Sequence, residues 1–154
     1  MSGFIASGTA NHKPSGTLTN SGFYPDIDLE HARKSLRLDG AVTDERLEQA
    51  AISAVLDVNH DLQPLAAKYK DFSSLADVPS DQVGGDSALL HLYRRAVYCS
   101  IGAEIAERYR SYDSTAQGNQ RADDLTPSID EYRRDSRFAI RDLLKRVRVT
   151  VELI

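Results

Sequence analysis

Tryptophan, disulfide bonds and long apolar runs are missing from this sequence of 154 residues. Its one cysteine, Cys99, has no partner for an internal disulfide, so we expect a protein of a reducing compartment. No run of 18 apolar residues occurs, which argues against a transmembrane helix. No basic segment followed by an apolar one opens the chain, so we expect no secretory signal and no membrane partner. The formal net charge of −4 disfavours a protein that coats nucleic acid through bulk electrostatics.

The remaining composition is that of one globular domain with an unusual beginning. Apolar residues make up 41% of the chain and charged residues 27%. Residues 1–22 hold four of the nine glycines, and Lys13 is their only charged side chain. Such a segment buries too little apolar surface to offset its ordering entropy, so we predict a flexible N-terminal tail over 1–22 that could still order against a partner.

The next part of the chain predicts two helices. A short helix from Leu29 to about Leu38 could be capped by Asp26 or Asp28, with Asp39-Gly40 ending it. A long helix begins after Thr43, and its apolar residues recur at intervals of three and four as far as Tyr69. Pro64 interrupts this stripe without changing its phase. We favour a kinked helix, while a separate helix headed by Pro64 and capped by Asp61 is the alternative.

A loop over 71–85 precedes a third helix, which is capped by Asp86 or Ser87 and reaches about Tyr112. Apolar residues cover two sides of this helix, so we expect it to be central, and small residues around Gly102 favour a close approach by a neighbouring helix. A polar turn over 113–118 and a short helical piece over 120–125 follow. Thr126-Pro127 predicts the start of the last helix, which runs to about Arg146.

The last eight residues change period. Residues 147–154 alternate apolar and polar side chains, which is typical of a strand. A single strand cannot satisfy its own backbone groups, and no second strong strand candidate occurs in the chain. Two interpretations stay open, namely strand addition to a neighbouring subunit or another protein, and a loosely docked tail. Under the first, the candidate interface residues are Arg148, Val149, Val151, Leu153 and Ile154.

Catalytic and metal-binding patterns are absent from the sequence. No two of the four histidines are three or four residues apart, and none lies beside Cys99, for which a buried, inert thiol is the expectation. Gly84-Gly85 lacks the Lys-Ser/Thr pair of a phosphate-binding loop. We therefore predict no enzyme, no catalytic residues, no metal site and no cofactor.

The last helix carries the strongest charge signal. Between residues 133 and 148 there are seven basic side chains against Asp135 and Asp142, and four of the seven are spaced by four residues, so that one face of a helix would hold Arg133, Arg137, Arg141 and Lys145. Such a face suits an acidic partner or phosphates. The alternative is a solvated face balanced by pairs such as Asp130–Arg134.

An ordered series of short segments, from about Phe23 to Ile154, resembles the head completion proteins of contractile-tailed temperate phages, the GPL family. No single segment is specific, and the resemblance depends on their order and spacing. The segments are Phe23-Tyr24-Pro25-Asp26-Ile27-Asp28, Ser74-Leu75-Ala76-Asp77-Val78-Pro79, Arg95-Ala96-Val97, Glu107-Arg108-Tyr109-Arg110, Ala116-Gln117-Gly118, Ala122-Asp123 and Ile129-Asp130-Glu131.

The resemblance implies a structural protein of the virion neck that is made in the host cytoplasm. Proteins of this kind act when DNA packaging ends and the packaging motor leaves. They bind the portal protein, form a ring with neighbouring copies that matches the portal's twelve-fold symmetry, retain the genome and offer a surface to a tail-side connector or terminator protein. The DNA passes through the channel without sequence-specific binding. Extended terminal arms commonly reach a neighbour or the portal, which favours 147–154 as such an arm.

Together these observations predict an all-α fold, a small bundle of about four helices. It would consist of a flexible tail over 1–22, a helical adaptor domain over 23–146 and an extended arm over 147–154. Two other functions stay open. One is a small helical nucleic-acid-binding regulator that uses the basic last helix, although no turn-linked recognition helix is evident. The other is an accessory component of the packaging motor.

Overall fold

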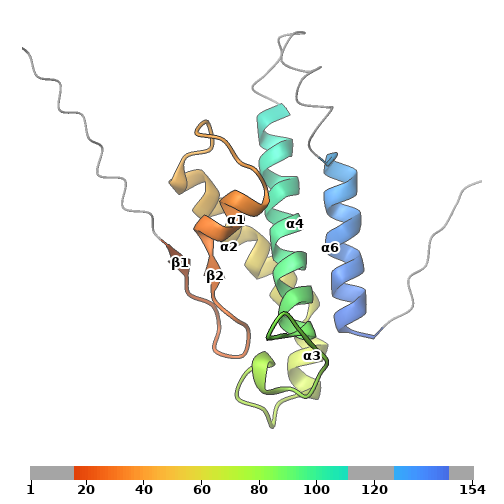
Figure 1. The fold of residues 1–154 in the computed structure, drawn as a ribbon. Helices are drawn as coiled ribbons and strands as arrows, with labels where there is room; N and C mark the ends of the chain where they lie inside the picture. The colour runs from red at the N-terminus through yellow and green to blue at the C-terminus, as the bar shows by residue number, and fades with distance from the viewer. Residues whose placement is uncertain (1–15, 111–126, 146–154) are drawn as a thin grey trace, which may run out of the picture.

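The structure is a computed structural model that describes residues 16–110 and 127–145. Within these ranges the chain forms five α-helices, one 3₁₀ helix and four two-residue strands. The predicted helical class is therefore confirmed. The long helix α4 (Ala88–Arg110) lies in the middle, with α6 (Ile129–Leu143) along one side of it and α2 (Asp44–Asp61) behind it (Figure 1).

The fold begins before the predicted boundary at residue 23. Strand β1 (Thr17–Leu18) pairs antiparallel with β2 (Ile27–Asp28), and the Leu29 N–H donates to the Gly16 carbonyl at 3.1 Å. Residues 16–22, which we had assigned to the tail, therefore belong to the domain. Strands of two residues are too short to show an alternating pattern, which is why the sequence did not reveal them. Residues 1–15 lie outside the described residues.

Helix α1 (Leu29–Ser35) begins as predicted but ends early. The Asp28 carboxylate, and not that of Asp26, accepts the His31 N–H at 2.8 Å and caps the helix. At the other end, Arg37 takes a left-handed conformation with φ 55°, and the Leu38 N–H returns to the Arg33 carbonyl. A Schellman turn thus closes the helix before Asp39-Gly40, with arginine in the place usually held by glycine.

The predicted cap at Thr43 is confirmed, because its hydroxyl accepts the Arg46 N–H at the start of α2. The favoured kinked helix is wrong. The chain divides at Leu62 into α2 and a short helix, α3 (Gln63–Lys68), with Pro64 in its first turn. Asp61 is not its cap either, since α3 has no side-chain cap. Leu62 and Leu65 are both buried, so the apolar stripe continues across the division.

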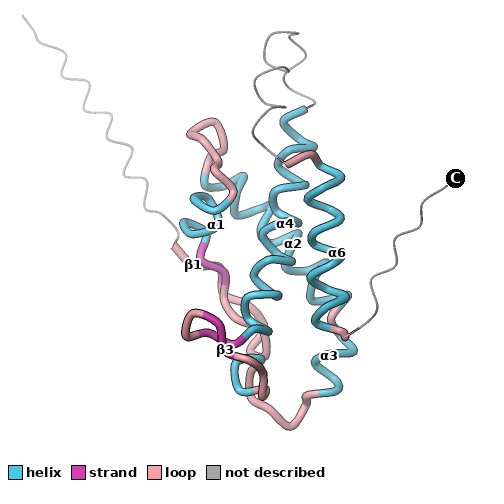
Figure 2. The backbone as a smooth tube through the Cα atoms, turned by 45° about the vertical axis from the view of Figure 1, so that its right-hand side comes forward, coloured by secondary structure: helices cyan, strands magenta, loops and turns pink. Residues whose placement is uncertain are grey.

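The predicted loop over 71–85 contains ordered elements. A 3₁₀ helix, η1 (Leu75–Asp77), is held by the Leu75 N–H, which donates to the Phe23 carbonyl at 2.8 Å. Strands β3 (Gln82–Val83) and β4 (Asp86–Ser87) then form a hairpin beside the start of α4 (Figure 2). Gly84 and Gly85 both have positive φ, as the tight turn of such a hairpin requires. Glycine pairs of this kind mark a turn and not a phosphate site.

Helix α4 is central, as its two apolar sides predicted. It packs against both α2 and α6, and Tyr93, Ala96, Val97 and Ile101 on it are fully buried. The helix extends to Arg110, and the predicted end at Tyr112 lies outside the described residues. Burial on two sides makes α4 the element on which the positions of the other helices depend.

A closed triangle of hydrogen bonds joins α4 to α2 and to the N-terminal segment. Asn20 Nδ2 donates to the Tyr93 hydroxyl at 2.7 Å, this hydroxyl donates to Asn59 Oδ1 at 2.6 Å, and Asn59 Nδ2 donates to Asn20 Oδ1 at 2.9 Å. The Tyr93 ring stacks on Tyr24, with centroids 5.0 Å apart. Burial raises the pKa of Tyr24 to about 12 and also raises the pKa of Tyr93, so both phenols stay protonated at neutral pH.

We expect Tyr93→Phe to lower the free energy of unfolding by about 1–3 kcal/mol, because the two asparagine side chains lose a shared partner in a poorly solvated place. Urea unfolding followed by circular dichroism measures the change. Tyr132→Phe is the matched control, since this ring is also buried but its hydroxyl makes no hydrogen bond within the described residues. Equal stabilities of the two variants would contradict a structural role for the triangle.

Candidate functional site

The basic helix α6 begins and ends differently from the prediction. Its cap is Ser128, and a capping box is complete: the Ser128 hydroxyl accepts the Glu131 N–H, and the Glu131 carboxylate accepts the Ser128 N–H at 2.7 Å. These hydrogen bonds lower the pKa of Glu131. The predicted start at Thr126-Pro127 is therefore wrong. The helix ends at Leu143 and not near Arg146, because Lys145 takes a left-handed conformation with φ 52°.

Helix α6 lies unusually close to α4 at Gly102. A Cβ atom added to Gly102 would come within 2.8 Å of the Tyr132 ring, so only glycine leaves room for this ring. One turn further along α6, the buried Ser136 hydroxyl donates to the Ala96 carbonyl at 2.9 Å. The predicted close approach at small residues of α4 is confirmed. These contacts fix which side of α6 faces outward.

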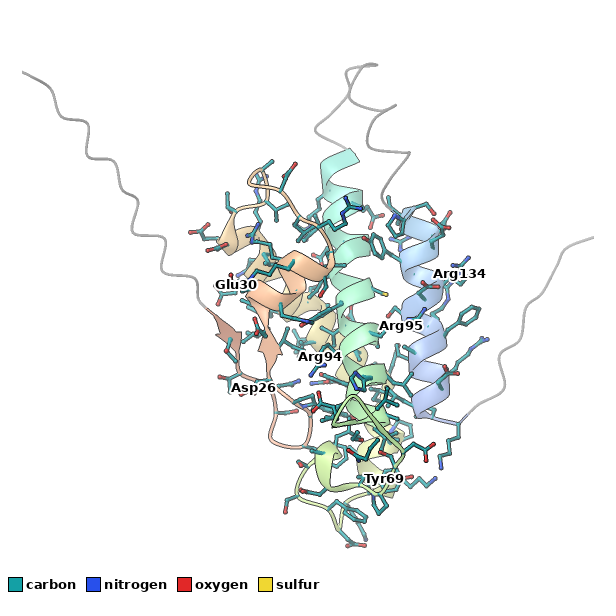
Figure 3. The ribbon with its side chains drawn as sticks, in the orientation of Figure 1. Asp26, Glu30, Tyr69, Arg94, Arg95 and Arg134 are labelled. Atoms are coloured by element: carbon teal, nitrogen blue, oxygen red, sulfur yellow. The ribbon has the colours of Figure 1, made fainter. Side chains whose placement is uncertain are left out.

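Ion pairs neutralise part of the positive charge of α6. Arg133 Nη2 lies 2.7 Å from Glu107 Oε2 on α4, and Arg134 pairs with the neighbouring Asp135 at 3.1 Å. Arg95 on α4 reaches the same Asp135 carboxylate at 3.4 Å, whereas Arg134 lies on the outer side of α6 (Figure 3). The predicted Asp130–Arg134 pair is therefore wrong. Since these groups are about half exposed, each pair contributes only about 0–1 kcal/mol.

The four cations that are spaced by four residues do not all lie on one face of the helix. Arg133, Arg137 and Arg141 lie in α6, but Lys145 follows the end of the helix and does not continue its face. Arg133 is engaged by Glu107, and Arg137 is exposed. Together Arg133 and Arg137 border a hollow of about 690 Å³ between α2, α4 and α6. The basic surface of α6 is thus smaller than the sequence indicated, and it adjoins a groove that the sequence did not reveal.

A second hollow of about 650 Å³ lies between the end of α1, α4 and the start of α6, and Cys99 borders it. Cys99 is only partly buried, which differs from the predicted buried side chain, and its partial burial raises the pKa of the thiol. His31 Nδ1 lies 2.9 Å from the Tyr98 hydroxyl, and His91 Nε2 lies 2.7 Å from the Val83 carbonyl, so both imidazoles have structural partners.

Over residues 16–110 and 127–145, no group of three or more histidine, cysteine or acidic side chains is arranged to hold a metal ion. Nor does any helix in the described part of the chain have the length and apolar character needed to cross a membrane.

Several predictions lie outside the described residues. They are the helical piece over 120–125, the strand-like segment over 147–154 and, within it, the candidate interface residues Arg148, Val149, Val151, Leu153 and Ile154. These stay predictions. The described chain reaches Lys145, so the C-terminal segment begins just beyond the end of α6.

Comparison with known proteins decides the family. The family model described as phage head completion protein (GPL) matches residues 18–154. This chain belongs to the phage head completion protein (GPL) family. It is 37% identical to the "Head completion/stabilization protein" of Escherichia phage P2 over 142 residues, which cover 89% of this chain and 82% of that protein. No solved structure is significantly similar to the chain.

A more distant relative is consistent with this assignment. The chain is 25% identical over 96 residues to a "Probable head completion/stabilization protein" of Haemophilus phage HP1, covering 61% of this chain and 64% of that protein. The resemblance seen in the sequence is therefore confirmed. As a GPL family member the chain has a structural role in completing the phage head, and it is a component of the virion.

Gly102→Ala tests the contact that positions α6 in this GPL protein. A helical glycine replaced by alanine ordinarily gains up to about 1 kcal/mol of stability, but here the added methyl group must displace the Tyr132 ring. We expect a net loss of about 1–3 kcal/mol from overpacking. Thermal unfolding is the measurement, and Gly40→Ala is the control because nothing lies within 4 Å of its Cβ position. A stabilised Gly102→Ala variant would show that α6 does not depend on this contact.

Proposed function

We propose that this protein binds the portal ring when DNA packaging ends, forms a ring there with neighbouring copies, retains the genome and offers the surface to which the tail attaches. The observation that carries the proposal is the 37% identity with the P2 head completion/stabilization protein over most of both chains. A helical domain whose C-terminal segment begins just beyond the end of α6 is consistent with a connector that reaches adjacent proteins. The protein is proposed to act without catalysis or a cofactor.

The C-terminal segment is the proposed arm. Residues 147–154 alternate apolar and polar side chains and need backbone partners, and Arg148, Val149, Val151, Leu153 and Ile154 are its proposed contacts with the portal or a neighbour. The strands of the described residues form two pairs, β1 with β2 and β3 with β4, and each strand has two residues, so these pairs offer short edges only. The arm therefore finds its partner on another polypeptide.

The cations along one side of α6 are the second proposed contact. Arg137 and Arg141 follow Arg133 along one side of the helix, and Lys145 lies just past its end. In a mildly acidic protein this surface suits an acidic patch of the portal or of an adjacent copy. The same net charge disfavours a tight grip on DNA, which must leave through the channel.

A nucleic-acid-binding regulator is the weaker candidate. It would need the basic helix to face a duplex, but Arg133 and Arg134 are held in ion pairs and α6 is packed against α4 along its buried side. The GPL family assignment also favours a head protein over a regulator. A packaging-motor component would copurify with the motor, whereas the proposed connector copurifies with the portal.

Removal of residues 147–154 tests the arm. We expect the truncated protein to keep its helical circular dichroism spectrum, because the domain core lies between residues 16 and 145, and to lose recruitment to purified portal-bearing heads. Cosedimentation of protein and heads measures recruitment. Recruitment equal to that of the full chain would show that the arm is not required.

Charge reversal tests the surface of α6. The double variant Arg137→Glu/Arg141→Glu should bind portal-bearing heads roughly tenfold more weakly at low salt, because two positive charges of this helix become negative. The difference should shrink as salt screens the charges. Lys68→Glu/Lys70→Glu is the matched control, since it changes the net charge equally at exposed positions beyond α2. If binding to heads changed neither with the α6 charges nor with the salt concentration, this face of α6 would be solvated and would not be a contact surface.

A further inference from the structure

The hollow between α2, α4 and α6 is an open groove with walls of different charge. Helices α2 and α6 both pack on α4, so α4 forms the floor, where Ser100 and Ala103 lie. Asp57 and Asp61 line the wall formed by α2, and Arg133 and Arg137 line the wall formed by α6. Val58 and Ile140 add apolar surface. A volume of about 690 Å³ is large enough for several side chains of an extended peptide.

Two carboxylates of this groove have no cationic partner among the described residues. On α4, Glu104 pairs with Arg108 at 2.8 Å and Glu107 pairs with Arg133 at 2.7 Å. Asp57 and Asp61, by contrast, are exposed and form no ion pair with any described residue. They are one turn apart in the last turns of α2, where they repel each other and face the negative end of the helix dipole. A cationic partner would relieve both effects.

The chain itself carries a matching segment. Beyond Lys145, the residues at alternate positions on one side of an extended segment are Arg146, Arg148 and Thr150, and Val147, Val149 and Val151 occupy the other side. Alternate residues of such a segment are about 7 Å apart. Residues four apart on a helix, as Asp57 and Asp61 are, are separated by about 6 Å along the axis. The two arginines can therefore pair with the two carboxylates in register, while the valines face the α6 wall, where Ile140 adds apolar surface.

We propose that this groove receives the C-terminal segment 146–154 of an adjacent copy of the chain, with Arg146 against Asp61, Arg148 against Asp57 and Thr150 near Ser53. The inference rests on the proposed ring, which brings such copies together. Insertion of the segment into the groove of its own chain is the alternative, and the experiment below distinguishes the two arrangements.

Disulfide trapping between two differently sized chains tests the proposal. In a Cys99→Ala background, one full-length chain carries Ser53→Cys and the other carries Thr150→Cys. On mixing at high concentration and on portal-bearing heads, we expect a heterodimer yield several-fold above that of the control pair Ser73→Cys with Thr150→Cys. A single chain that carries both cysteines should form intermolecular and not internal disulfides. An internal disulfide, or a heterodimer yield no higher than the control, would overturn the proposal.

Charge exchange in the same assay tests the register. Asp57→Lys/Asp61→Lys in the groove chain should lower the heterodimer yield roughly tenfold at low salt, and Arg146→Glu/Arg148→Glu in the arm chain should do the same. Combining both pairs should restore the yield, whereas Asp71→Lys/Asp81→Lys should leave it unchanged. A heterodimer yield that does not change when the groove charges are reversed would overturn the proposed site. If such variants are still recruited to heads through residues 147–154, the connector function stands without this groove.

Discussion

The close contact between Gly102 and the Tyr132 ring determines where α6 can lie, and much of the molecular surface follows from it. With the Ser136 hydroxyl bonded to the Ala96 carbonyl, α6 has one rotation about its own axis that keeps Tyr132, Ala139 and Leu143 buried. That rotation places Arg133 beside Glu107 and turns Arg137 toward the hollow between the helices. A larger residue at position 102 would move α6 outward, and the groove and its charges would change together.

On the opposite side of α4, a polar contact has the corresponding role. The Tyr93 hydroxyl both accepts and donates within a ring of three hydrogen bonds, so the N-terminal segment, α2 and α4 share one partly buried junction. Hydrogen bonds linked in this way strengthen one another in a poorly solvated interior. The junction holds Asn59 near the C-terminal end of α2 and so also positions Asp57 and Asp61, one wall of the groove. The contacts on the two sides of α4 therefore position the two walls of the same groove.

Local signals in the sequence predicted local structure well. Thr43 and one of the two candidate aspartates cap helices as expected, and the two apolar sides of α4 identified it as central. The errors have physical causes. Arg37 and Lys145 end their helices in left-handed conformations that glycine usually adopts, so no breaker residue marked these ends. The capping box of Ser128 and Glu131 begins α6 two residues beyond Thr126, where proline at the first helical position had favoured the start. The groove depends on residues far apart in the chain, which periodicity cannot place together.

Assembly that is restricted to the portal would require contacts between copies that are weak individually but strong when many form together. The repulsion between Asp57 and Asp61 and the exposed Arg137 destabilise the lone domain only slightly, because each group is solvated. In a ring, every copy would offer one groove and one arm, so each pairing is repeated around the circle. In the proposed ring, once the portal had brought the first copies together, each further pairing would be effectively intramolecular and would need no high affinity of its own. Unpaired charge on the surface of the free protein would then favour the proposed closed ring over pairs of copies in solution, since one arm bound in one groove would still leave a second groove and a second arm unfilled.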